Sequence, residues 1–190
     1  MNILAIDSTA DNLIVAVVTQ KTEYVNALCK QRNQTSATLC GYVDEVLGRA
    51  GITFDDLDAY ACGIGPGSFT GIRIGIATVK GYQLAKPKKL IAVGSLYTLC
   101  CGNGRAIIDA GNGYYYAKYR CKKVVEEPQL ISYDDKRAKG ATTFTNVGDH
   151  IEKLVKVVRD AYKKGDFITQ FSPVYIRKSQ AEENLDKSTN

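Results

Sequence analysis

The sequence predicts an α/β protein with two lobes, the second smaller than the first. Three observations lead to this prediction. The first 29 residues alternate short apolar runs with polar turns, two later segments have helical spacing, and a similar succession starts again after residue 100. A chain of 190 residues, 45% of them hydrophobic, can fill the core of one domain or of two small lobes. We therefore expect lobes at residues 1–100 and 101–190.

The first lobe opens with three predicted strands. Residues 3–8 form a short apolar run that ends on Asp7 and Ser8, and a polar turn separates it from a second run at residues 13–19. Another turn at residues 20–21 leads to a third run that ends near Cys29. Short apolar runs joined by tight polar turns are typical of an antiparallel meander.

A helix is expected over residues 34–50. Thr35 or Ser36 can cap its start, and Gly51 can end it. One side of this helix carries apolar residues at helical spacing, namely Leu39, Val43, Val46, Leu47 and Ala50.

The rest of the first lobe continues the alternation. A strand is expected at residues 59–64, a glycine-rich loop at 65–68, a helix at 69–85 and a strand at 90–94. Three strands followed by helix, strand, helix and strand is the plan of one actin-like, ribonuclease-H-like lobe.

The second half begins in the same way but is shorter. Strands are expected at residues 106–110, which include Asp109, and at residues 113–121. A helix is expected at residues 149–162, with one apolar face made by Ile151, Leu154, Val155 and Val158. The second lobe is therefore predicted to be an abbreviated copy of the first.

Composition narrows the class of protein. The opening residues do not have the pattern of a secretory signal, and the apolar run at residues 13–18 is far shorter than the ~20 residues of a membrane span. The six cysteines include no CxxC pair. We expect these cysteines to be buried like small hydrophobic residues and to keep reduced thiols. His150 is the only histidine and has no metal-ligand spacing around it. A soluble, cytoplasmic protein without a metal site or membrane contact is expected.

The positive charge of +5 lies mostly in the second half. Residues 1–100 contain 9 Lys and Arg against 8 Asp and Glu, and residues 101–190 contain 16 against 12. The basic residues gather in three clusters: Lys86, Lys88 and Lys89; Lys118, Arg120, Lys122 and Lys123; Lys136, Arg137 and Lys139. Such clusters permit contact with an RNA backbone, but a solvated surface is the favoured interpretation. Tyr114, Tyr115 and Tyr116 fit a strand better than a stacking platform.

Glycines in the helix at residues 69–85 point to close packing. Gly71, Gly75 and Gly81 each cost roughly 0.5–1 kcal/mol relative to alanine. Gly71 and Gly75 lie on one face, which allows a partner helix or ligand, or the chain's own sheet, to approach closely. We favour a partner interface on the two helices, made by Leu39, Val43, Val46, Gly71, Ile72, Gly75, Ile76 and Val79. Gly75→Leu is then expected to abolish partner binding without unfolding the chain.

The loop before this helix permits a second interpretation. Free N–H groups at a helix N-terminus favour anions, and Gly65 and Gly67 leave them accessible. The loop does not have the GxxxxGK[ST] spacing of a P-loop. Ser68 and Arg73 are candidate anion contacts, although Arg73 can equally be an ordinary surface residue.

Five segments, in the same order along the chain, resemble signatures of the TsaB (YeaZ) family. Residues 3–9 and 65–85 resemble its two N-terminal signatures, of which GPGSFTGxRIG is the more specific. Shorter matches follow at residues 93–96, 108–110 and 172–182.

The resemblance implies the acetate kinase/actin/Hsp70 (ASKHA) fold and a role in N6-threonylcarbamoyladenosine (t6A) modification of tRNA. It implies a non-catalytic subunit that binds and activates TsaD, works with the ATPase TsaE, and forms a homodimer when TsaD is absent. In that family, helices equivalent to residues 36–50 and 69–85 pack together as a bundle. Contact with tRNA is expected only through the complex, or weakly.

The resemblance also places Asp7, Ser8 and Thr9 where superfamily members hold metal and phosphates, and it permits ATP or ADP near Ser68 and Arg73 at the subunit junction. No intrinsic cofactor is expected, because a glycine-rich adenosine loop is missing and residues 33–38 contain none of the metal-binding histidines of TsaD-type subunits.

The alternative is an ATP-dependent small-molecule kinase of the same superfamily, with Asp7 and Asp109 as metal and base positions. The chain departs from many family members in having Thr35 in place of a histidine, and in its short second lobe.

Overall fold

The computed structural model describes residues 1–10, 12–29 and 35–176. The segment at residues 177–182, part of the C-terminal family resemblance, lies outside the described residues, as do residues 33 and 34. The described elements, in chain order, are β1 (Asn2–Asp7), β2 (Asn12–Thr19), β3 (Glu23–Cys29), α1 (Thr35–Ala50), η1 (Phe54–Asp56), β4 (Ala59–Gly65), α2 (Phe69–Ala85), β5 (Lys89–Gly94), α3 (Ser95–Cys100), β6 (Gly104–Asp109), β7 (Tyr114–Arg120), β8 (Lys123–Ile131), η2 (Lys136–Ala138) and α4 (Val147–Lys164).

The first lobe is built on a five-stranded sheet in the order β3-β2-β1-β4-β5. The first three strands form the predicted antiparallel meander, in which Ala5 faces Ala16 and Val15 faces Asn26. Strands β4 and β5 run parallel to β1, so Asp7, Gly65 and Gly94 end their strands at the same edge of the sheet. In open α/β sheets, this carboxyl edge is where ligands usually bind.

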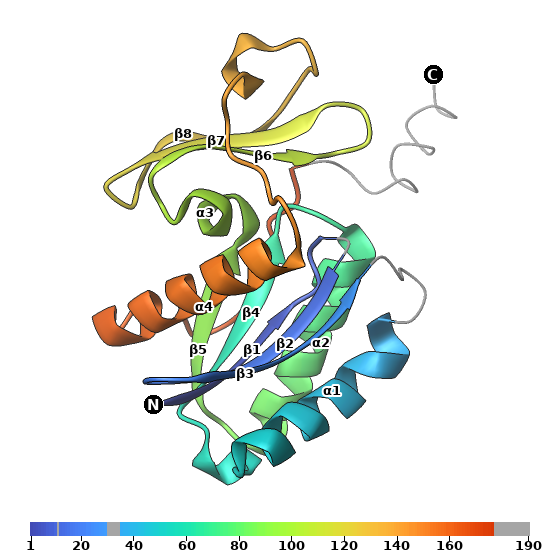
Figure 1. The fold of residues 1–190 in the computed structure, drawn as a ribbon, viewed down its shortest axis with the longest axis vertical. Helices are drawn as coiled ribbons and strands as arrows, with labels where there is room; N and C mark the ends of the chain where they lie inside the picture. The colour runs from blue at the N-terminus through green and yellow to red at the C-terminus, as the bar shows by residue number, and fades with distance from the viewer. Residues whose placement is uncertain (11, 30–34, 177–190) are drawn as a thin grey trace.

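Helices cover both faces of this sheet (Figure 1). Alternate residues of each strand point to opposite faces, so Leu4 and Ile6 pack against α1 and α2, while Ile3 and Ala5 pack against α4. The predicted apolar stripe of α1 is confirmed, since Leu39, Val43, Val46 and Leu47 are all buried. The α1 helix ends, as predicted, at Gly51, whose φ of 66° suits glycine.

The position of α4 corrects the predicted lobe boundary. This helix comes from the second half of the chain, but Leu154, Val155 and Val158 lie in the core of the first sheet. The chain beyond α4 also returns to the first lobe, where Ile168 bridges to β5 and Phe171 is buried in the α1–α2 core. Residues 147–174 therefore do not form part of a separate lobe at 101–190.

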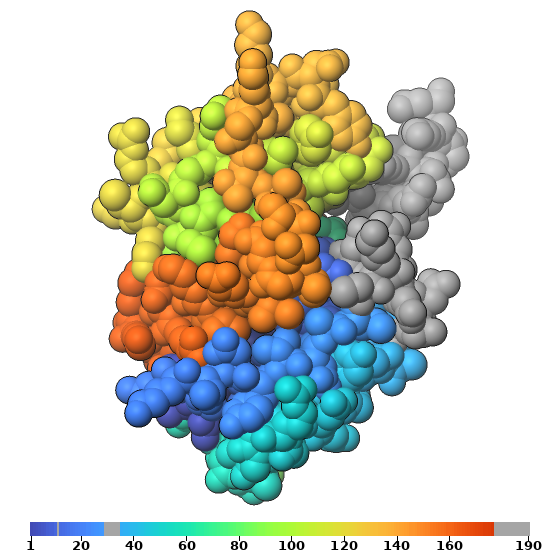
Figure 2. All heavy atoms as spheres, viewed as in Figure 1, coloured from blue at the N-terminus to red at the C-terminus, as the bar shows by residue number. Residues whose placement is uncertain are grey.

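The second lobe is small. It consists of the antiparallel sheet β6-β7-β8, whose inner face packs on α3 through Leu96, Leu99 and Tyr115. In Figure 2 the connection from this sheet to α4 runs over the front of the molecule as a continuous orange band. Neither α3 nor β8 was expected from the sequence, because α3 has six residues and β8 is a largely exposed edge strand containing Pro128.

Cysteines do not share one environment. Cys62 is buried in the α1–α2 core, and burial, reinforced by the negative charge of Asp7, raises the pKa of its thiol. Cys100 and Cys101 are partly buried, but Cys40 and Cys121 are exposed. The expectation that all the cysteines are buried is therefore wrong for these two residues.

Candidate functional site

The turn after β1 is a buried polar center. Asp7, Ser8 and Thr9 have 0%, 5% and 1% of their surface exposed. The Asp7 Oδ1 atom accepts hydrogen bonds from the Thr9 backbone N–H at 2.9 Å and from Thr9 Oγ1 at 2.7 Å. Since a hydroxyl donates one hydrogen bond, Ser95 Oγ is the donor to Thr9 Oγ1, at 2.8 Å. The turn is thereby fixed to the start of α3.

The other oxygen of Asp7 contacts the only histidine in the chain. His150 Nε2, on α4, lies 3.0 Å from Asp7 Oδ2, and the histidine is fully buried. Burial is the largest single influence on the pKa of Asp7, and by itself it would raise that pKa because it opposes ionisation. Even so, the hydrogen bond and charge of His150, with the hydrogen bonds from Thr9, hold the pKa of Asp7 below its usual value.

Sequence reasoning missed His150 because it was considered only as a metal ligand. A signal was available in the spacing of His150, Leu154, Val157 and Val158, all of which are buried on α4. This spacing puts the histidine on the apolar face of the helix. A buried imidazole needs a polar partner, and an acidic residue that ends a buried strand is a suitable one.

The glycine-rich loop is closed by the chain's own atoms. Ser68 caps α2 by accepting a hydrogen bond from the Gly71 N–H at 3.2 Å, and the Ser68 N–H donates to the Thr9 carbonyl at 2.6 Å. A Cβ atom at Gly67 or Gly71 would overlap the carbonyl group of Thr9 or Ser8. The glycines therefore allow the β1–β2 turn, and not a partner helix, to approach α2.

The six predicted anion contacts do not form one open site. Asp7, Ser8 and Thr9 are buried, which contradicts their assignment to a nucleotide. Ser68 and Arg73 are exposed. The Arg73 guanidinium lies 3.9 Å from the center of the Phe69 ring, and its Nε donates to the Tyr175 hydroxyl at 3.4 Å. Arg73 is thus an ordered surface residue beside two aromatic rings.

The predicted partner-contact residues are also corrected. All eight (Leu39, Val43, Val46, Gly71, Ile72, Gly75, Ile76 and Val79) are buried within the chain itself. Gly75 faces Ser8 Oγ, which a Cβ would meet at 2.8 Å. Gly75→Leu is therefore expected to disrupt folding, contrary to the sequence-based expectation.

The opposite sides of the same two helices are exposed. We call them the outer helix surface, which comprises Ala37, Cys40, Gly41, Asp44, Glu45, Gly48 and Arg49 of α1 and Thr70, Arg73, Ala77, Lys80, Gly81, Leu84 and Ala85 of α2. Most of these side chains are small. Leu84, however, is 86% exposed, the highest value among the large hydrophobic residues described. A Cβ atom at Gly41, Gly48 or Gly81 would have no described neighbour within 4 Å outside its own helix.

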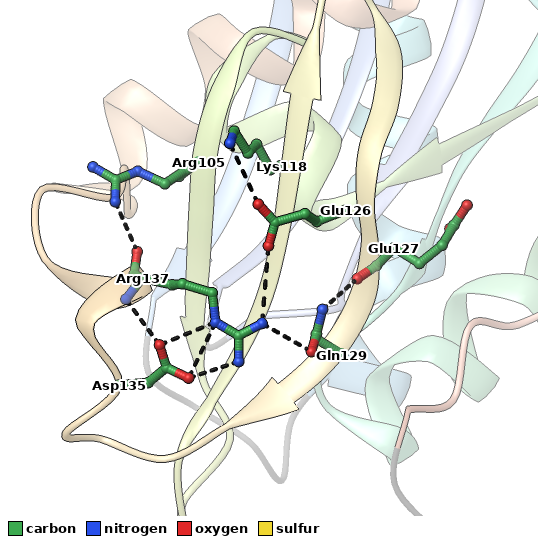
Figure 3. A network of polar contacts seen from close by, with 7 residues as sticks. All are labelled: Arg105, Lys118, Glu126, Glu127, Gln129, Asp135 and Arg137. Atoms are coloured by element: carbon green, nitrogen blue, oxygen red, sulfur yellow. Dashed lines mark hydrogen bonds and ion pairs between the residues drawn. The ribbon is translucent and has the colours of Figure 1, made fainter.

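Several basic residues outside these helices are paired with acids. Lys86 contacts Asp55 at 2.6 Å, and Lys122 contacts Asp160 at 2.8 Å. In the polar network of Figure 3, Lys118 lies 3.4 Å from Glu126. The structure thus favours the interpretation of these clusters as a solvated surface.

Arg137 is at the center of that network and binds Asp135 at 2.6 Å (Figure 3). It covers the ring of Tyr116, which is fully buried in β7, so Tyr116 does not offer a stacking face to solvent. Asp109, the base position of the kinase alternative, is exposed and accepts hydrogen bonds from the Gly111 N–H and the Tyr133 hydroxyl.

The described residues, 1–10, 12–29 and 35–176, contain neither a candidate metal site nor a candidate membrane-spanning helix. In these ranges no three His, Cys, Asp or Glu side chains converge as a metal site would require. Nor do they contain a helix with the length and apolar character needed to cross a bilayer.

The Asp7–His150 pair predicts a specific acid response. The folded pKa of Asp7 lies below the unfolded value of about 3.9, so the pair stabilises the fold above that value and loses this contribution as pH falls through the folded pKa. In urea titrations, the difference in unfolding free energy between the wild type and Asp7→Asn should be largest above about pH 5 and shrink below about pH 4. A difference that stays constant from neutral to acidic pH would contradict this assignment.

Comparison with known proteins adds independent information. A family model described as "TsaD: tRNA N6-adenosine threonylcarbamoyltransferase" matches residues 30–168, more than half of the chain. The chain is 36% identical over 132 residues to the tRNA threonylcarbamoyladenosine biosynthesis protein TsaB of Escherichia coli K12, a match that covers 63% of the chain and 55% of that protein. It is 31% identical over 189 residues to the tRNA N6-adenosine threonylcarbamoyltransferase of Methylobacterium nodulans, covering 87% of the chain and 52% of that protein.

The chain spans about half the length of these curated relatives. Among solved structures, YeaZ from Pseudomonas aeruginosa superposes with a TM-score of 0.72 at 23% identity, covering 92% of the chain and 99% of that structure. This likeness shows that the two chains share a fold.

Proposed function

The chain belongs to the TsaB (YeaZ) family and to the wider family of the TsaD model, and from this premise we propose that it is a non-catalytic subunit in t6A modification of tRNA. Its proposed role is to bind and activate a TsaD-type catalytic subunit. The tRNA modification is expected to take place in the cytoplasm.

The outer helix surface is the observation that carries this proposal. Backbones of two helices approach closely where side chains are small, and Gly41, Gly48 and Gly81 leave open space on α1 and α2. Leu84 supplies an apolar anchor that is otherwise left in water. A related first lobe would present a matching pair of helices, so the two subunits could form a four-helix contact. In the absence of TsaD, a second copy of this chain is the proposed occupant.

The closed β1–β2 turn supports a non-catalytic role. In this chain, both oxygens of Asp7 are engaged by Thr9 and His150, and the N–H of Ser68 is engaged by Thr9. The groups that would face a phosphate are therefore occupied by protein atoms.

Other partners follow from the same proposal. TsaE would join through the complex. We propose that tRNA is held mainly by the catalytic subunit, because several residues of this chain's basic clusters are paired with acids. ATP or ADP is proposed to bind only at the junction of the two subunits, near Ser68 and Arg73. If the chain binds the TsaD-type subunit with equal affinity in the presence and absence of ATP or ADP, the proposed nucleotide site at the junction is contradicted.

Reconstitution tests the proposed function. Cognate TsaD-type and TsaE-type proteins, a threonylcarbamoyl donor, ATP and unmodified tRNA are incubated with and without the chain, and t6A is quantified in the digested tRNA. We expect t6A to form only when the chain is present, and the chain alone to hydrolyse no ATP. Formation of t6A at the same rate without the chain would overturn the proposal, and ATP turnover by the chain alone would favour a small-molecule kinase.

A further inference from the structure

The pair of Asp7 and His150 joins parts of the chain that are 143 residues apart. Both side chains are fully buried. A buried charge is retained only when it is paired, and removing one member leaves the other uncompensated. This contact is therefore expected to be maintained throughout the lifetime of the folded state.

His150 is positioned by few groups. Its ring stacks on Phe144 with ring centers 3.9 Å apart. The Nδ1 atom has no hydrogen-bond partner among the described residues, so Asp7 provides the ring's hydrogen bond. Phe144 itself packs against the core of the second lobe. The histidine is thus held from one side by the second lobe and from the other by the end of β1.

The β1–β2 turn transmits this contact to α2. Ser8 Oγ donates a hydrogen bond to the Gly71 carbonyl at 2.8 Å, and the Thr9 carbonyl accepts one from the Ser68 N–H. Since Gly67 and Gly71 leave no space between the turn and the helix, a shift of the turn must move the first turn of α2.

We propose that the Asp7–His150 pair is a latch through which α4 and the second lobe fix the β1–β2 turn and, through it, the start of α2. His150 is a positioning residue in this arrangement. The latch acts in the free chain, whether or not the proposed partner binds.

Titratable groups near the latch come from β4 and α4. On β4, Cys62 lies close enough to Asp7 for the carboxylate to affect its thiol. On α4, Asp149 precedes His150 and pairs with Lys153 at 2.9 Å, and Lys153 lies 5.8 Å from the center of the Phe144 ring. Lys153→Ala therefore alters a charge on the same helix and near the same ring without touching the buried pair, which makes it the matched control.

Hydrogen exchange measured by NMR tests the latch. In His150→Ala, the amides of Ser68, Gly71 and Ile72 should exchange at least about fivefold faster relative to those of Gly51 and Ile52 at the far end of α1. Free imidazole, which can enter the space left by the ring, should slow this exchange toward the wild-type rate. Lys153→Ala should show neither effect.

Two results would overturn the latch. One is unchanged exchange at the start of α2, and the other is equal acceleration at all of these amides, which would indicate a loss of global stability only. If His150→Ala does not fold, Asp7→Asn, which preserves the packing, carries the same test. The wild type offers a further check because its single histidine should give a slowly exchanging Nε2–H signal, protected by the hydrogen bond to Asp7. Absence of that signal would also contradict the proposal.

Discussion

Gly71→Ala is expected to lower the free energy of unfolding by about 2–3 kcal/mol, a cost typical of overpacking a well-packed site. The added Cβ would overlap the Ser8 carbonyl, which is a backbone atom of the buried turn and cannot rotate away. The better helix propensity of alanine offsets only part of this, at most ~1 kcal/mol. For a chain of this length, Tm should fall by roughly 4–12 °C, measured by calorimetry or circular dichroism.

Gly81→Ala is the matched control, because it makes the same change in the same helix. Gly81 is exposed, and a Cβ there would have no described neighbour within 4 Å outside its helix. This variant should gain about 0.5–1 kcal/mol of stability. If both variants shift Tm in the same direction, the result would contradict the close packing of the β1–β2 turn against α2.

Leu84→Lys is expected to weaken binding of the cognate TsaD-type subunit by at least about 30-fold, which corresponds to about 2 kcal/mol at an interface hot spot. Leu84 is 86% exposed, so in the free chain the change removes almost no packing. Lysine is also a good helix former and is favoured near a helix C-terminus. The stability of the free chain should therefore stay within about 0.5 kcal/mol of the wild type.

Val125→Lys is the control, because it also adds a positive charge and removes an exposed apolar side chain. Val125 is 51% exposed and lies on β8 of the second lobe, away from the outer helix surface. Its substitution should leave the affinity measured by isothermal titration calorimetry unchanged. Equal weakening by both variants would indicate a nonspecific charge effect, and no weakening by Leu84→Lys would exclude that residue as an anchor.

The regular elements of the first lobe could be predicted because their apolar residues follow simple patterns. The apolar stripe of α1 has helical spacing, and β1 and β2 are continuous apolar runs that are buried along almost their whole length. Periodicity, however, shows only that a helix face is buried, not what covers it. The sequence-based interpretation assigned the apolar stripes of α1 and α2 to a partner interface, whereas the chain's own sheet covers them.

Long-range arrangement was harder to predict. The apolar face of α4 was found, but nothing local indicates that this helix returns to the first sheet. The pairing of His150 with Asp7 depends on that return, so the most unusual contact of the site could not be inferred from either residue alone. The short α3 and the polar edge strand β8 carry too little periodic signal to be recognised. The family resemblance, in contrast, was recognised from motif residues and is confirmed by the comparisons.

The most direct test of the central proposal is to mix the purified chain with its cognate TsaD-type protein and measure the molar mass by light scattering on a sizing column. We predict a defined hetero-complex for the wild type and for Val125→Lys, and a smaller fraction of complex for Leu84→Lys at the same concentrations. If the wild-type chain and the TsaD-type protein elute separately at concentrations where both are folded, the proposed role as a partner subunit is wrong.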